Sequence, residues 1–163
     1  MVAVGVFSPG RGGTAVSAQA PNPCALLTVD DVETIAANST VADGVSSSLP
    51  AVGSVTCRYA WGVGTGRFKL DVTVNEASRM FPGVSADQMR QRLLDSVRAG
   101  TADAVLSDIG EAAVFTPQSP VYASATALVK GRILALHLDG IFAGEMLPAA
   151  REPMARAVQG HLT

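Results

Sequence analysis

The sequence predicts an α+β protein in which an antiparallel sheet has helices packed on one face, in the order α-β-β-α-β-β-β-α. Two hairpin patterns predict the sheet, one over residues 54–74 and one over residues 121–139. Two further segments, residues 28–38 and 85–98, each combine a helix start signal with an apolar stripe at helical spacing. Because the links between successive strands are short, the strands should pair antiparallel, with the helices covering the apolar side of the sheet.

The first predicted helix begins at Thr28, which matches a capping box with Asp31 three residues later. Val32 and Ile35 then continue an apolar stripe with helical spacing. The stretch from residue 39 to residue 53 is rich in Ser, Ala, Val and Gly, and we expect a long surface loop there.

The first hairpin should have strands at residues 54–61 and 68–74, which are rich in β-branched and aromatic residues. Strand side chains alternate between the two faces, so the hairpin has one apolar side. The residues of that side are Val55, Cys57, Tyr59, Trp61, Phe68, Leu70, Val72 and Val74. The glycines of the connecting loop, residues 62–67, permit the positive φ values that a strand reversal needs.

The second helix should run from Ser85 to Arg98, because Ser85 and Gln88 form another capping-box pattern. Arg92 should face outward. The expected inward residues are Met89, Leu93, Leu94 and Val97.

The last part of the chain should add strands to the same sheet. A short strand should follow Ile109, and longer strands should span residues 121–129 and 133–139 around a turn at residues 130–132. A final helix should start near residue 149 or 153 and end at residue 162.

The composition is that of one folded domain. The chain has 163 residues, of which 48% are hydrophobic and 16% charged, which is enough to bury a core. A net charge of −2 and a pI of 5.6 exclude the basic surface typical of nucleic-acid binding. No apolar run reaches the roughly 20 residues of a transmembrane helix. We expect a leader or remnant of an export signal at residues 1–20 and a single α+β domain at residues 21–163, with no cofactor and no metal.

The two cysteines, Cys24 and Cys57, could form one disulfide or remain two buried thiols, since no ligand pattern for zinc accompanies them. Residues 18–20 read Ala-Gln-Ala before Pro21, a cleavage pattern of the secretory type, although no basic segment precedes it. We favour export, and with it a disulfide, because the cysteines and the leader indicate the same compartment. The expected location is secreted or extracytoplasmic.

Three short motifs carry a resemblance to a known family. They are CALLT at Cys24–Thr28, CRYAW at Cys57–Trp61 and IGEAA at Ile109–Ala113. This pattern resembles a family of actinobacterial exported proteins of unknown function, many of them lipoproteins. The resemblance implies secretion and a disulfide, and it offers no catalytic residues. This chain differs from the pattern in having Glu111 where the family has Asp, and it has no lipobox before Cys24.

The candidate binding residues come from the polar side of the predicted strands. Arg58, Asp71, His137 and Asp139 should project from the face that the helices leave open. An antiparallel sheet covered on one side has a polar outer face in any case, so solvation alone accounts for these residues. If they converge, Arg58 could hold a carboxylate and His137 would make binding depend on pH.

We therefore predict a secreted or cell-envelope binding module without catalytic activity, whose partner is an unknown small molecule or protein. The alternative is a small extracytoplasmic enzyme that uses His137 and nearby carboxylates. We favour the binding module, because the sequence contains no nucleophile elbow, phosphate loop or metal-ligand pattern.

Overall fold

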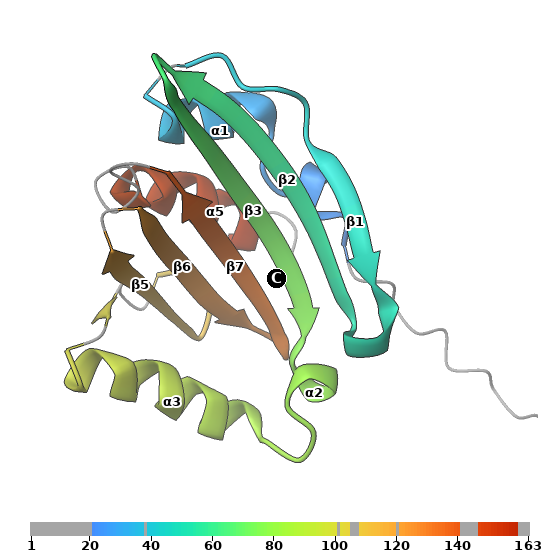
Figure 1. The fold of residues 1–163 in the computed structure, drawn as a ribbon. Coiled ribbons are helices and arrows are strands. Elements are labelled where there is room, and N and C mark those ends of the chain that lie inside the picture. Colours follow the sequence, from blue (N-terminus) through green and yellow to red (C-terminus); the bar gives the residue numbers. More distant parts are fainter. Residues whose placement is uncertain are drawn as a thin grey trace, which may run out of the picture.

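The computed structural model describes residues 21–37, 39–100, 102–104, 108–119, 121–140 and 147–159. The expected leader, residues 1–20, and the end of the expected last helix lie outside these residues. Within them, one antiparallel sheet has seven strands in the spatial order β1-β2-β3-β7-β6-β5-β4, which confirms the α+β class (Figure 1).

The strands are β1 (Val45–Leu49), β2 (Ser54–Val63), β3 (Gly66–Glu76), β4 (Asp103–Ala104), β5 (Ala112–Ser119), β6 (Tyr122–Val129) and β7 (Arg132–Asp139). The helices are α1 (Val29–Ile35), α2 (Ala77–Met80), α3 (Ala86–Arg98) and α5 (Arg151–Ala157). Three 3-10 turns are η1 (Pro23–Ala25), η2 (Pro50–Val52) and η3 (Leu147–Ala150). Both expected capping boxes form, at Thr28 with Asp31 and at Ser85 with Gln88.

The centre of the sheet is the pairing of β3 with β7, which joins the two hairpins. Val72 lies opposite Cys57 on one side and Leu136 on the other, so the apolar faces of both hairpins are in register. The β2–β3 connection is tighter than the six-residue loop expected from the sequence. Val63 pairs with Gly66, which leaves a two-residue turn in which Gly64 has a φ of +58°.

The main core lies between the apolar side of the sheet and the pair α1 and α5, which are seen behind the strands in Figure 1. Tyr59 is buried there and donates its hydroxyl to the carbonyl oxygen of Leu27. Trp61, the single tryptophan, is 5% exposed and stacks on Phe68 with ring centroids 5.6 Å apart. A disulfide joins Cys24 to Cys57 and ties η1 to β2.

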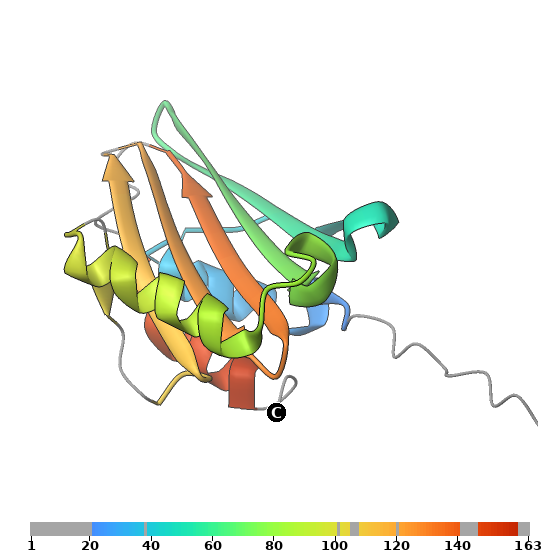
Figure 2. The same cartoon turned by 90° about the horizontal axis from the view of Figure 1, so that it is seen from below.

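One helix departs from the expected arrangement, in which all helices share one face. Met89 and Leu93 of α3 pack with Leu128 and Ile133, which lie on the face opposite the α1–α5 core. Figure 2 shows α3 across the near end of the sheet, with α1 and α5 beneath the strands. The physical reason is that the β6–β7 hairpin is apolar on both faces near its turn, so each face needs a cover there.

Two strands form where the sequence indicated no strand. β1 lies within the expected loop at residues 39–53, and all five of its residues are exposed. β4 is only two residues long and pairs with β5. Both are edge strands held by backbone pairing, so neither requires the apolar alternation by which strands are recognised in a sequence.

The IGEAA motif has a structural role at the start of β5. Gly110 has a φ of +64°, and a Cβ atom at that position would lie 2.4 Å from the carbonyl oxygen of Leu128. Glu111 accepts the backbone N–H of Lys130 in the β6–β7 turn at 2.7 Å. The motif therefore fixes the segment before β5 against the β6–β7 hairpin.

Candidate functional site

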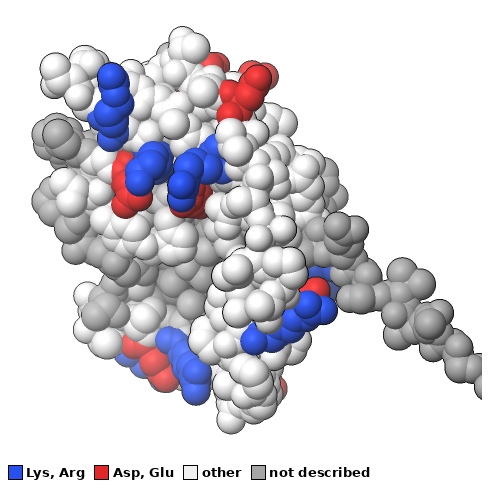
Figure 3. Space-filling model, turned by 45° about the vertical axis from the view of Figure 1, so that its right-hand side comes forward, with Lys and Arg blue, Asp and Glu red and all other residues white. Residues whose placement is uncertain are grey.

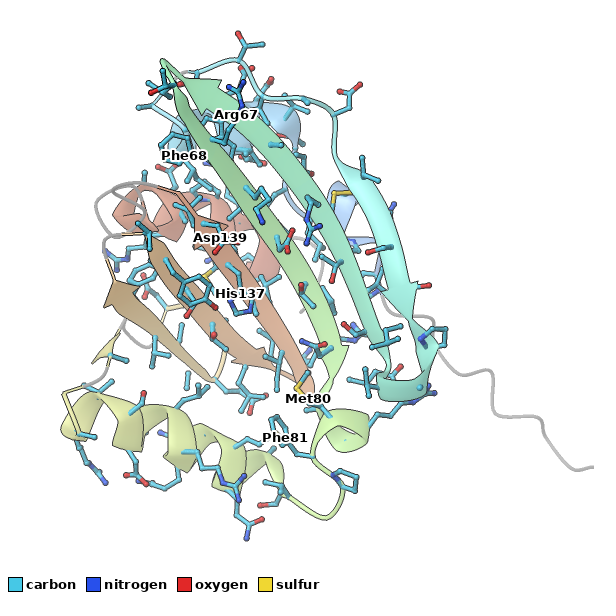
Figure 4. The ribbon with its side chains drawn as sticks, in the orientation of Figure 1. Arg67, Phe68, Met80, Phe81, His137 and Asp139 are labelled. Carbon is cyan, nitrogen blue, oxygen red and sulfur yellow. A yellow bond between two sulfur atoms is a disulfide. The ribbon has the colours of Figure 1, made fainter. Side chains whose placement is uncertain are left out.

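The four candidate binding residues do lie on one face, in three neighbouring strands. Arg58 of β2 is opposite Asp71 of β3, which in turn is opposite His137 of β7, and Asp139 follows two residues later. Figure 4 shows His137 and Asp139 on the side of the sheet that faces the reader. The strand register therefore places all four side chains on the same face, as the alternation predicted, and puts Asp71 next to both Arg58 and His137.

Arg58 and Asp71 neutralise each other. Nε and Nη2 of Arg58 each donate to an oxygen of Asp71 at 2.7 Å, and these hydrogen bonds raise the pKa of Arg58 above its ordinary value. Lys69 is 3.5 Å from Asp139 in a second cross-strand ion pair. The Nε–Nη2 edge of the Arg58 guanidinium, one of the two edges that can hold a carboxylate in a bidentate grip, is thus already occupied. This geometry does not favour the carboxylate clamp expected from the sequence.

His137 is held by Tyr122 of the neighbouring strand. The Tyr122 hydroxyl and Nδ1 of His137 are 2.7 Å apart, and the two rings stack with centroids separated by 6.0 Å. Burial lowers the pKa of His137 below its ordinary value, and the carboxylates of Asp71 and Asp139 oppose this shift only in part. Burial also raises the pKa of the Tyr122 hydroxyl. At neutral pH this pair is uncharged.

The lowered pKa of His137 should make the fold less stable in mild acid. The unfolded chain takes up the proton at about pH 6.5, before the folded chain does, so the contribution is complete above that pH and lost as pH falls through the folded pKa. We expect the urea midpoint of the native protein to fall more between pH 7.5 and pH 5.5 than that of His137→Gln. Parallel pH profiles for the two proteins would contradict the assignment.

Arg58, Asp71, His137 and Ser124 are successive cross-strand partners and form a polar row across the sheet. A groove lies next to this polar row, between α3 and the sheet. Its volume is 330 Å³. Apolar side chains from both sides line it: Phe81, Met89, Leu93, Val114, Leu128 and Ile133. The polar side chains in its lining are those of Arg92, Ser96, Ser124 and Thr126. Ser124 lies opposite His137 in the strand register, so the groove and the polar row are contiguous.

Arg92 is the cation of this groove. Arg98 on the same helix bonds Asp95 at 2.9 Å, whereas Arg92 forms no ion pair with any residue in the described part of the chain. Arg92 is exposed, and its i, i+3, i+4 relation to Met89 and Leu93 places it on the same side of α3 as the groove. Arg92 is exposed, as expected from the sequence, but the groove beside it was not predicted. The available signal was the pair of large apolar residues, Leu128 and Ile133, on the side of β6 and β7 that also carries Ser124, Thr126 and His137.

On the face shown in Figure 3, Lys and Arg side chains lie beside Asp and Glu side chains in small mixed groups that are separated by uncharged surface. No group of three or more His, Cys, Asp or Glu side chains among the described residues is arranged to hold a metal ion. None of the described helices is long and apolar enough to cross a membrane. Comparisons with protein-family models, curated proteins and solved structures find no match to this chain.

Proposed function

We propose that this protein is an extracytoplasmic binding module that holds a small amphipathic anion in the groove beneath α3. The observation that carries the proposal is the unpaired cation Arg92 in the lining of an otherwise largely apolar groove. Small-molecule sites typically combine an apolar lining with a few polar groups that orient the ligand. The ligand's apolar part would lie against Leu93 and Ile133, and its anionic group would bind Arg92.

The groove also supplies neutral hydrogen-bonding groups. Ser124 and Thr126 lie on the sheet side of the lining, and either hydroxyl can donate or accept. Beyond Ser124, the row continues to the uncharged His137–Tyr122 pair. A hydroxyl or carbonyl group on the ligand would therefore hydrogen-bond to Ser124 or Thr126 of the sheet, while the negative charge of the ligand would bind Arg92 of α3.

Export is supported by the Cys24–Cys57 disulfide, because such bonds persist in oxidising compartments. The cleavage-type pattern at residues 18–20 and the resemblance to exported actinobacterial proteins support the same location. A soluble carrier or sensor outside the cytoplasm fits these features together.

The test uses 8-anilino-1-naphthalenesulfonate, an aromatic anion whose fluorescence rises on transfer to an apolar site. We expect saturable binding to the native protein and about tenfold weaker binding to Arg92→Gln, since a charge-assisted hydrogen bond contributes roughly 1.5 kcal/mol. Arg90→Gln, on the same helix and outside the groove lining, is the matched control and should bind like the native protein. Octanoate should displace the probe at concentrations where 1-octanol does not.

Equal binding by Arg92→Gln and Arg90→Gln would contradict the proposal. Leu93→Trp provides an independent check, because the larger side chain fills the groove and should abolish probe binding while leaving the circular dichroism spectrum unchanged. Retained binding by a folded Leu93→Trp protein would place the probe elsewhere.

One observation favours the enzyme alternative. Ser124, His137 and Asp71 are cross-strand neighbours in a single row, which is the residue set of a hydrolytic triad. The hydrogen bonds differ from those of a triad, since Nδ1 of His137 bonds Tyr122 and Asp71 bonds Arg58. Hydrolysis of p-nitrophenyl acetate that disappears in Ser124→Ala would favour the enzyme over the binding module.

A further inference from the structure

The outer edge of strand β1 lies outside the groove, so the proposed binding function does not use it. β1 pairs with β2 on one side only, and Figure 1 shows it as the outermost strand of the sheet. Val45 is 68% exposed and Leu49 is 60% exposed. The opposite edge of the sheet is the two-residue strand β4.

Natural sheets protect a long edge with a charge, a proline, a bulge or a covering element, because an open edge pairs with other strands. β1 has no charged residue, no proline and no bulge. Its sequence, Val-Ser-Ser-Ser-Leu, is uncharged, and its five pairs with β2 follow one another without a register shift. Pro50 comes only after the strand has ended. The short edge β4 is protected by its length, whereas β1 is left available for pairing.

The register shows which backbone groups of β1 point outward. In the two-residue β2–β3 turn, Val63 and Gly66 form the hydrogen-bonded pair that closes the turn. Hydrogen-bonded pairs then alternate along an antiparallel ladder, so odd-numbered residues of β2 bond to β3 and even-numbered ones bond to β1. The β1 partners of the even-numbered residues are Val45, Ser47 and Leu49. The N–H and C=O groups of Ser46 and Ser48 therefore face the open side.

We propose that β1 pairs with β1 of a second copy of this chain, antiparallel, around a two-fold axis at Ser47. In this register Ser46 of each copy faces Ser48 of the other, and the four outward N–H groups and four outward C=O groups form four hydrogen bonds. Val45 of each copy lies opposite Leu49 of the other, so the two most exposed apolar side chains of the strand cover each other.

The strand is self-complementary in this arrangement, which is what a two-fold interface requires. Val-Ser-Ser-Ser-Leu presents the same order of apolar and polar side chains in both directions, and no like charges meet across the axis. The paired segment is only five residues long. Two such strands bury much less surface than the roughly 1,200 Å² of a stable interface. The dimer should therefore be weak and depend on protein concentration.

Sedimentation equilibrium of the full chain tests the association. We expect the weight-average mass to rise from 16.7 kDa toward twice that value as concentration increases from about 10 μM to 1 mM. Ser47→Lys places two ammonium groups against each other at the axis and should keep the protein monomeric. Thr65→Lys, which adds the same charge in the β2–β3 turn, should dimerise like the native protein. A native mass that stays at 16.7 kDa throughout would overturn the proposal.

A cysteine at the axis tests the register. Ser47 faces its own copy in a pair that is not hydrogen-bonded, where Cα atoms are about 4.5 Å apart, within reach of a disulfide. Under mild oxidation Ser47→Cys should give a covalent dimer. Ser48→Cys should not, because residue 48 of one copy faces residue 46 of the other and the two introduced cysteines are not opposite each other. Equal cross-linking of both variants would show random collision and contradict the two-fold pairing.

Discussion

Leu136→Ala is expected to lower the free energy of unfolding by about 2–5 kcal/mol, a large part of the stability of a domain of this size. Leu136 is fully buried on β7 and lies opposite Val72 of β3 and Ala125 of β6. Its loss leaves a cavity at the centre of the sheet, where neighbours on both sides are themselves held by backbone pairing and can relax little.

Leu49→Ala is the matched control for this measurement. It makes the same side-chain change in a strand of the same sheet, but Leu49 is 60% exposed at the β1 edge. Its cost should stay within about 0.5 kcal/mol at protein concentrations where the chain is monomeric. Urea titration followed by Trp61 fluorescence measures both, because the single tryptophan is buried in the same core. Similar midpoint shifts for the two variants would contradict the assignment of the core to this face.

Reduction of the Cys24–Cys57 disulfide should also lower the free energy of unfolding by a large amount. The bond spans a sequence separation of 33 residues. Closing a loop of that length removes chain entropy from the unfolded state that is equivalent to roughly 3–4 kcal/mol. The bond also holds η1 against β2, where Tyr59 contacts the carbonyl oxygens of Cys24 and Leu27. We therefore expect dithiothreitol to lower the urea midpoint of the native protein substantially.

The double variant Cys24→Ala with Cys57→Ala separates the bond from other effects of the reductant. It should unfold near the midpoint of the reduced native protein and should not respond to dithiothreitol. Intact mass before and after alkylation gives a direct readout of the thiols. Two alkylatable thiols in protein purified without reductant would contradict both the disulfide and the export argument that it supports.

The sheet face that binds ligand in our proposal was only partly visible in the sequence. Strict alternation in β3 and β7 put Asp71 and His137 on the polar side, and the register confirms that they are neighbours. What alternation cannot show is which polar groups satisfy each other. Arg58 is bonded by Asp71 and His137 by Tyr122, so the charged residues that looked available are largely paired. The binding role of these residues stays a prediction.

The features that follow from the sequence alone are local. Both capping boxes and the two hairpins with their apolar sides depend on residues close in the chain, and two cysteines allow only one intramolecular pairing if they oxidise. The packing of α3 on the second face and the edge position of β1 became clear only in the three-dimensional structure. Amphipathicity tells a helix to bury one side but not against which face of a sheet, and backbone pairing of an edge strand needs no side-chain pattern. The groove at Arg92 exists because α3 lies on the second face, so no local pattern could reveal it.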